Sequence, residues 1–238
     1  MFRKGPFGHL LDIQIKKCPR QLLVHLIRRL SKQSTDNTLI FNLEGNIVKF
    51  GLGEFHLISG LNCQPFPQST TSNIKEEFNS ELRTACFSNI DILDRNKIIA
   101  AFSIAQLSDQ LMVKLANLLI LDCFINCKQL HNVVDWKHLK MIDDEETLLN
   151  FPWGRLSFNL TVEYMRKAAE DLTVNFSLQG FPHILVCWAL EIIPKLSESP
   201  NGIATRIGHR SPRIINWKLE QQPLFGHICN GITSSQVM

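Results

Sequence analysis

The sequence predicts a mainly α fold of the α+β kind: a single compact helical domain with one short β-hairpin near residues 38–50. Apolar residues recur at helical spacing in most of the apolar segments, whereas a single pair of β-prone runs flanks a glycine turn. A chain of 238 residues that is 45% hydrophobic and 20% charged is also long enough to bury a sizeable core. The predicted domain covers residues 1–222, and we expect an irregular tail at 223–238.

The first predicted element is a basic amphipathic helix over residues 19–32, opened by Pro19. Its polar side carries His25 and several cations, some of which fall in the last turn, where they suit the helix dipole. Its apolar side packs on the core and consists of Leu22, Leu23, Leu26, Ile27 and Leu30.

Two β-prone runs between Thr38 and Phe50 follow, separated by Glu44-Gly45-Asn46, and they predict a hairpin. Residues 53–59 then predict a short helix. Gly60 is its expected left-handed cap, after which Leu61 folds back on the helix. Residues 64–79 are rich in Pro, Ser and Thr, so we expect a loop there that does not separate domains.

The second half of the chain is predicted to be helical. Ser108 or Asp109 caps a long helix that runs to Phe124. Residues 151–155, Phe-Pro-Trp-Gly-Arg, are expected to form a fixed turn in which Trp153 is buried and Arg155 pairs with the acidic run 143–146.

Three further segments complete the predicted fold. A helix is expected over residues 159–172, and Gly180 with Pro182 separates it from the next. Residues 184–190 are apolar on all sides, which indicates a helix central to the core, with Trp188 buried. The chain after Pro194 is expected to be irregular.

Cysteine usage and apolar stretches predict a reduced intracellular protein. Seven scattered cysteines do not form a disulfide framework, and we recognise no export signal near Met1. The most apolar stretches, 115–125 and 184–193, are well short of the roughly 20 residues that a bilayer span needs, so no membrane association is expected. A nuclear location is favoured over a cytoplasmic one.

Positive charge is concentrated near the two ends of the sequence. Residues 1–32 carry a net charge of +7, whereas the whole chain carries +3. A second basic stretch, 206–218, contains no acidic residue. Such ends can attract nucleic acid or an acidic protein partner, but a solvated face with helix-end charges is the favoured interpretation, because a net charge of +3 is mild. The candidate contact residues are Arg20, Arg28, Arg29, Lys32, Arg210 and Arg213.

The residues provide no catalytic or metal-binding constellation, so we expect no catalytic residue, no metal and no cofactor. Cys123, Cys127 and His131 share a helical face, but the first and the last are roughly 12 Å apart along a helix axis, too far for one zinc ion. Gly51-Leu-Gly53 is not completed to a dinucleotide-binding loop, because His56 replaces the third glycine.

Four blocks of the sequence resemble, in order, a plant family, the domain of unknown function numbered nineteen eighty-five. The blocks are residues 50–63, 151–157, 180–194 and 213–218. The family is met in open reading frames of Mutator-like transposable elements, often upstream of a ubiquitin-like (SUMO) protease domain. The resemblance implies structural roles for the motif residues, which are Phe55, Gly60, Leu61, Pro152, Trp153, Gly154, Arg155 and Trp188.

The neighbouring protease suggests a rival interpretation, a fragment of a cysteine peptidase of the ubiquitin-like-protease family. Gln222 precedes Cys229, as an oxyanion-hole glutamine precedes a nucleophile. However, Ile228 stands where that family has aspartate, and no His-Trp motif lies upstream. We therefore predict a non-catalytic interaction module of a plant transposon-derived protein, without the protease lobe and with an unknown protein partner. Sequence-independent nucleic-acid binding through the basic ends is the main alternative.

Overall fold

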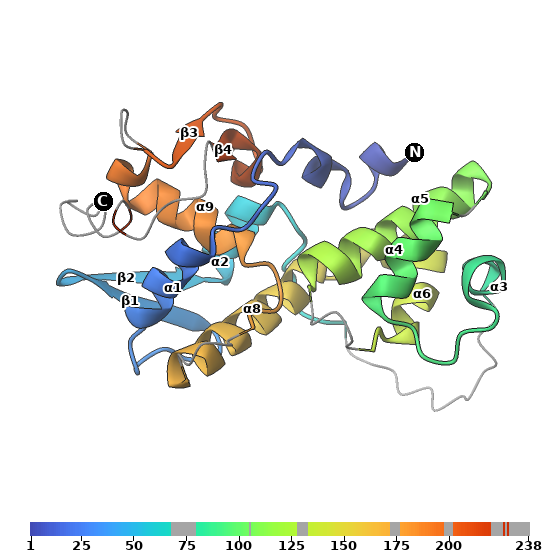
Figure 1. Cartoon of the computed structure of the whole chain (residues 1–238), viewed down its shortest axis with the longest axis horizontal. Helices are drawn as coiled ribbons and strands as arrows, with labels where there is room; N and C mark the ends of the chain where they lie inside the picture. Colours follow the sequence, from blue (N-terminus) through green and yellow to red (C-terminus); the bar gives the residue numbers. More distant parts are fainter. Residues whose placement is uncertain are drawn as a thin grey trace.

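Helices make up most of the chain and lie in two groups along its longest axis (Figure 1). The computed structural model describes residues 1–67, 80–104, 106–127, 133–171, 177–197, 202–219, 226 and 228. The helices are α1 (Arg20–Arg28), α2 (Leu52–Ser59), α3 (Glu81–Phe87), α4 (Arg95–Ile104), α5 (Asp109–Ile120), α6 (Trp136–Asp143), α7 (Glu145–Asn150), α8 (Trp153–Glu170) and α9 (His183–Ile192). The strands are β1 (Thr38–Leu43), β2 (Asn46–Gly51), β3 (Ala204–Arg206) and β4 (Trp217–Leu219). The predicted mainly α class is confirmed.

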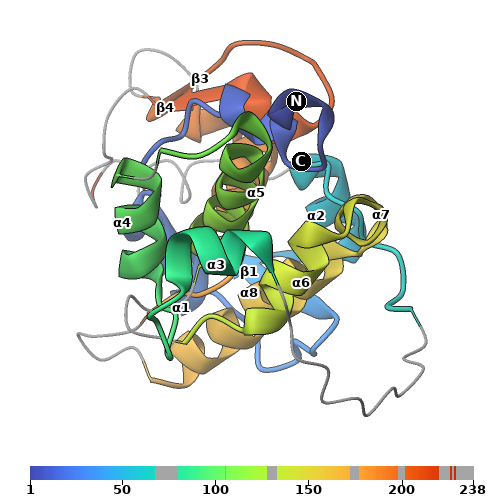
Figure 2. The same ribbon diagram turned by 90° about the vertical axis from the view of Figure 1, so that its right-hand side faces the viewer.

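One group is built around α5, which contacts α3, α4 and α6, as the view along the long axis shows (Figure 2). The other contains the hairpin, α1, α2, α9 and the β3–β4 pair (Figure 1). The buried apolar side chains form a hydrophobic cluster with members in both groups. Among the described helices, none combines the length and the apolar character that a membrane crossing requires.

The basic helix is shorter than predicted and covers residues 20–28 only. Beyond it the backbone turns to pair with β1: Asn42 donates its N–H to the Arg29 carbonyl at 2.9 Å, and Ser31 donates to the Ile40 carbonyl at 2.7 Å. The last predicted helical turn is therefore exchanged for strand-like hydrogen bonds. His25, predicted on the polar face, is buried.

The hairpin and the helix after it are confirmed. Glu44 and Gly45 form a two-residue turn with φ of 51° and 90°, the left-handed pair that a type I′ hairpin requires. Phe41 and Phe50 are fully buried and lie 5.0 and 5.4 Å, between ring centroids, from Trp188 of α9, which is itself buried as predicted. The hairpin thereby covers one side of the central apolar helix.

Gly60 ends α2 in the left-handed conformation, as expected, with φ of 70°. Leu61 is buried directly after it, and within α2 Phe55 packs edge-on against Phe158 of α8 at 5.6 Å. The long helix capped by Ser108 is also confirmed: it continues from α5 into a π-helical turn at Leu121–Ile125.

The expected turn at residues 151–155 is wrong, because α8 begins at Trp153, directly after Pro152. The helix tolerates Gly154 there because its backbone lies against residues 61–63: Gly154 donates its N–H to the Asn62 carbonyl at 2.8 Å. Arg155 does not pair with the acidic run. Its Nε donates to the carbonyls of Cys63 and Gln64 at 3.1 and 2.7 Å.

Trp153 is buried as predicted, with its indole N–H donated to the Leu148 carbonyl at 2.9 Å. The chain after Pro194 is less irregular than predicted, since β3 and β4 pair antiparallel in register Ala204 with Leu219. The expected tail at 223–238, apart from Gly226 and Ile228, and most of the expected loop at 64–79 lie outside the described residues.

Gly154 provides a sharp test of the contact between α8 and residues 61–63. A Cβ at this position would lie 2.5 Å from Cys63 Sγ and 2.8 Å from the Asn62 carbonyl oxygen. We expect Gly154→Ala to lower the free energy of unfolding by about 1–3 kcal/mol in urea denaturation, although alanine favours helix. Gly53→Ala in α2 is the matched control, because its Cβ would meet nothing within 4 Å. A neutral or stabilising Gly154→Ala would contradict the close approach.

Candidate anion-binding pocket

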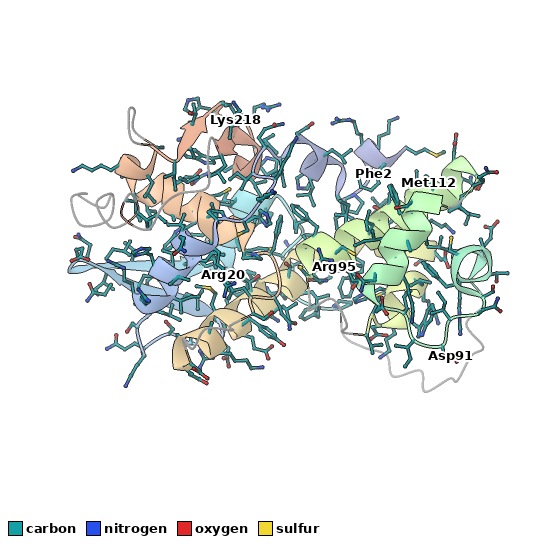
Figure 3. The ribbon with its side chains drawn as sticks, viewed as in Figure 1. Phe2, Arg20, Asp91, Arg95, Met112 and Lys218 are labelled. Atoms are coloured by element: carbon teal, nitrogen blue, oxygen red, sulfur yellow. The ribbon has the colours of Figure 1, made fainter. Side chains whose placement is uncertain are left out.

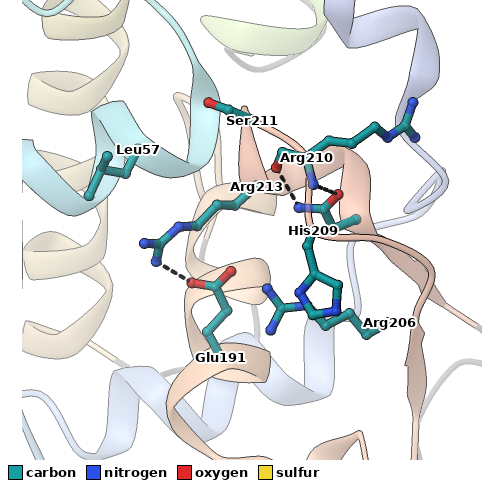
Figure 4. Close-up of a pocket in the computed structure, with 8 residues that line it drawn as sticks. Leu57, Glu191, Arg206, His209, Arg210, Ser211 and Arg213 are labelled. Atoms are coloured by element: carbon teal, nitrogen blue, oxygen red, sulfur yellow. Dashed lines mark hydrogen bonds and ion pairs between the residues drawn. The ribbon is translucent and has the colours of Figure 1, made fainter.

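A pocket of about 600 Å³ lies where α2, α9 and the segment between β3 and β4 meet (Figure 4). Leu57 comes from α2 and Glu191 from α9. Arg206 is the last residue of β3, and the segment between β3 and β4 supplies the remaining lining residues, which are His209, Arg210, Ser211, Arg213 and Asn216. The predicted contact residues Arg210 and Arg213 therefore lie together at one site.

Asn216 holds the backbone of the pocket segment in place. Its side chain is buried, its Oδ1 accepts the Arg210 N–H at 2.9 Å, and its Nδ2 donates to the Arg210 carbonyl at 2.7 Å (Figure 4). Ile207 in turn donates its N–H to the Asn216 carbonyl at 2.7 Å. The N–H and the carbonyl of Arg210 are both hydrogen-bonded to the Asn216 side chain. This buried side-chain amide therefore fixes the backbone position of Arg210.

Gly60 fixes the same segment against α2. A Cβ on Gly60 would lie 2.7 Å from Cβ of Pro212, so only glycine permits this approach. Position 60 therefore requires glycine for two reasons, the left-handed φ at the end of α2 and the close approach of Pro212. This contact gives the motif residue Gly60 a second structural role, the seating of the pocket segment.

The pocket carries an excess of positive charge. Arg213 donates from Nη1 to Glu191 Oε2 at 2.9 Å, and Arg206 lies over the Trp217 ring at 5.4 Å from its centroid. Arg210 and His209 are exposed. Three arginines and one carboxylate therefore line the pocket, although the Arg210 side chain points away from Glu191 (Figure 4). Such a lining is suited to binding a carboxylate or phosphate, since guanidinium offers paired donors.

The N-terminal cations do not join this pocket. Arg29 forms an ion pair with Glu44 at 3.0 Å, and with Arg28 it lines a separate, shallow depression beside the hairpin. Lys32 lies beyond the end of α1 and is exposed, while Arg20 lies in the first turn of that helix (Figure 3). The six predicted contact residues therefore divide into two sets, of which only Arg210 and Arg213 line the pocket.

Arg206, His209, Glu191 and Leu57 were not among the predicted contact residues. Arg206 was available to sequence reasoning, since it belongs to the same acid-free stretch as Arg210. Glu191 and Leu57 carry no such local signal, because they reach the pocket through the packing of α9 and α2.

Cys123 and Cys127, which the sequence places on one helical face, are largely shielded from solvent and lie near the Arg95 guanidinium. Arg95, labelled between the two helix groups in Figure 3, donates from Nη1 to Cys127 Sγ at 3.2 Å. Burial raises the pKa of the Cys123 thiol to about 12, and burial likewise raises the pKa of Cys63 to about 11. Within the described ranges, no group of three His, Cys, Asp or Glu side chains is placed to hold a metal. His131 and Cys229 lie outside these ranges.

A buried histidine–carboxylate pair joins the π-helical turn to α6. His138 Nδ1 lies 2.8 Å from Asp122 Oδ1, and the Asp122 side chain is 3% exposed. The edge of the Trp153 ring system covers the histidine at 6.1 Å between centroids. The pair therefore links the π-helical turn to α6 in the core.

Residues 26–164 match the family described as a domain of unknown function, DUF1985, over more than half of the chain. The chain belongs to this family. No curated protein and no solved structure matches it. The DUF1985 match contains Leu57 and Gly60 but ends before α9, so the arginines of the pocket lie outside the matched segment.

His183, a half-buried histidine whose two ring nitrogens are buried, supports a pH prediction. Neither ring nitrogen has a hydrogen-bond partner in the described part of the chain, and the ring lies 5.0 Å from that of Phe124. Burial lowers the pKa of His183 to about 4, from 6.5 in the unfolded chain. Below pH 6.5 the unfolded chain therefore binds a proton that the folded protein does not, and stability falls as the pH falls.

We expect the free energy of unfolding to decrease by about 2 kcal/mol between pH 7 and pH 5 through this group. Urea denaturation of His183→Phe should show a correspondingly weaker pH dependence. Equal pH dependence in His183→Phe and the wild type would show that the His183 ring is not desolvated.

Proposed function

We propose that the chain is a non-catalytic interaction module that binds an anionic group of a protein partner in the pocket of Arg206, Arg210 and Arg213. The observation that carries the proposal is the presence of three arginines in the lining of one pocket, with the Arg210 backbone held by the buried Asn216 side chain. A backbone that is already held in place lowers the conformational entropy lost on binding, which favours recognition of a compact anion.

The chemistry of the described cysteines supports a binding role over a peptidase role. A nucleophilic cysteine requires a lowered pKa or an adjacent base. Burial instead raises the pKa of Cys18 and of Cys123 to about 12. The Cys127 thiol accepts a hydrogen bond from Arg95 Nη1 at 3.2 Å.

The biological setting proposed here follows from the family resemblance. We propose that the module works in a plant transposon-derived protein and in the nucleus. In such a setting an acidic protein segment is the partner class that the pocket favours.

Sequence-independent nucleic-acid binding is the second candidate, supported by the same arginines, because guanidinium also pairs with phosphate. A duplex presents a continuous row of phosphates, however, and the two basic sets line separate depressions. The local pocket therefore favours a compact anionic group over an extended backbone.

Fluorescence anisotropy with two labelled probes, a hexaglutamate peptide and a 12-base-pair duplex DNA, distinguishes the candidates. The Arg206→Ala/Arg210→Ala variant should weaken peptide binding at least tenfold, since it removes two charge-assisted donors. The control replaces Arg20, Arg28, Arg29 and Lys32 with glutamine and should leave peptide binding unchanged.

Duplex binding that is lost in the N-terminal variant, with a log–log salt slope of about −3 to −4, would overturn the proposal in favour of nucleic acid. Circular dichroism of each variant establishes that the fold is retained. Peptide binding that survives in the Arg206→Ala/Arg210→Ala variant would exclude the pocket as the binding site.

A further inference from the structure

The basic pocket does not end at Arg213 but continues along the surface between α2 and α9. A second depression of about 350 Å³ shares Leu57, Glu191 and Arg213 with it. This depression extends to β2 of the hairpin, and its other lining residues are Val48, Lys49, Glu54, Ile58, Trp188 and Ile192. We call the two together the α2–α9 groove.

Leu57 makes the middle of the α2–α9 groove apolar. Its side chain is 53% exposed, because the neighbouring residues Phe55 and Ile58 already supply the buried face of α2. Val48 and Ile192 extend the apolar surface at the hairpin side and are half-buried. Covering this leucine by a partner removes apolar area from water, which is favourable at about 25 cal/mol per Å².

Cations flank this apolar centre on both sides. Lys49 is exposed at the hairpin end, and Arg206 and Arg210 lie at the other end. The two acidic residues of the groove are already engaged, since Glu54 accepts the Gly51 N–H at 2.8 Å and Glu191 accepts from Arg213. The order along the groove is therefore Lys49 at one end, Leu57 beside the Arg213–Glu191 ion pair in the middle, and Arg206 with Arg210 at the other end.

From this order we infer that the partner is a protein segment with one apolar side chain between acidic residues, and that the apolar side chain packs on Leu57. The inference rests on the proposed function, because it uses the same arginines. Charge complementarity selects acidic flanks, and Leu57 selects the apolar anchor. A nucleic-acid backbone could pair its phosphates with the cations at the two ends of the groove. It has no apolar group in its backbone to pack on the exposed leucine between them.

Anisotropy measurements with a small set of peptides test the inference. The probes are three fluorescent undecapeptides of glycine and serine that carry one leucine, with two glutamates on each side at spacings of one, two or three residues. Matched versions replace leucine with serine. At least one leucine peptide should bind roughly tenfold more tightly than its serine version, as expected for the burial of a leucine side chain.

Two exposed apolar residues give a matched pair of variants. Leu57→Ser should reduce the affinity of the leucine peptide to that of the serine version. Ile47→Ser changes a residue that is 60% exposed in the hairpin, outside the groove, and should have no effect. Lys49→Gln should weaken the leucine and serine peptides alike, because it acts on the acidic flank.

The outcomes separate this inference from the proposed function. If leucine and serine peptides bind equally and both are lost in Arg206→Ala/Arg210→Ala, the pocket stands and the apolar anchor is wrong. If no acidic peptide binds at 1 mM, on the order of the weakest affinity that such an assay resolves, both proposals fail. Tighter binding of the 12-base-pair duplex than of every peptide would also overturn both.

Discussion

The close approach of α8 to the chain after α2 is the contact on which most of this structure depends. Gly154 donates to the Asn62 carbonyl at 2.8 Å with no room for a side chain between them. Asn62 in turn donates from its side chain to the Asn150 carbonyl at 2.7 Å. With the helix start held there, Trp153 is directed toward α6 and α7, and Phe158 toward the hairpin side of the core. One junction of backbone atoms therefore ties the two helix groups together.

A second glycine contact, between Gly60 and Pro212, fixes the position of the basic segment at the surface. Gly60 lies two residues before Asn62, and it allows Pro212 to pack against the end of α2. The basic segment thus rests on the same short stretch of chain that receives α8. An exposed loop with several arginines would ordinarily be mobile, and the like charges would separate. Here the packing of Pro212 and the buried Asn216 side chain compensate for bringing the arginines together.

Sequence reasoning succeeded where the decisive interaction is local. The hairpin follows from Glu44-Gly45, whose turn geometry is set by two adjacent residues, and α9 follows from a run that is apolar on every side. It failed where distant contacts outweigh local preference. Pro152 and Gly154 predict a turn, yet the first turn of α8 is stabilised by residues about ninety positions earlier. The helix predicted to reach Lys32 ends at Arg28, because β1 offers hydrogen bonds to the residues that follow.

The same distinction explains how much of the candidate site could be foreseen. A count of charges along the sequence identifies Arg210 and Arg213 as candidates, but it identifies the cations of α1 equally well. Only the fold shows that Arg29 is already paired with Glu44 of the hairpin turn, while Arg206 and Arg210 both line one pocket. Glu191 reduces the net charge of that pocket, yet it also orients Arg213 at 2.9 Å and so fixes the boundary between the basic and apolar parts of the α2–α9 groove. The proposed recognition depends on this boundary, because the exposed Leu57 lies beside the arginine donors there. A purely basic surface would present the same donors without an apolar side chain on which a partner could pack.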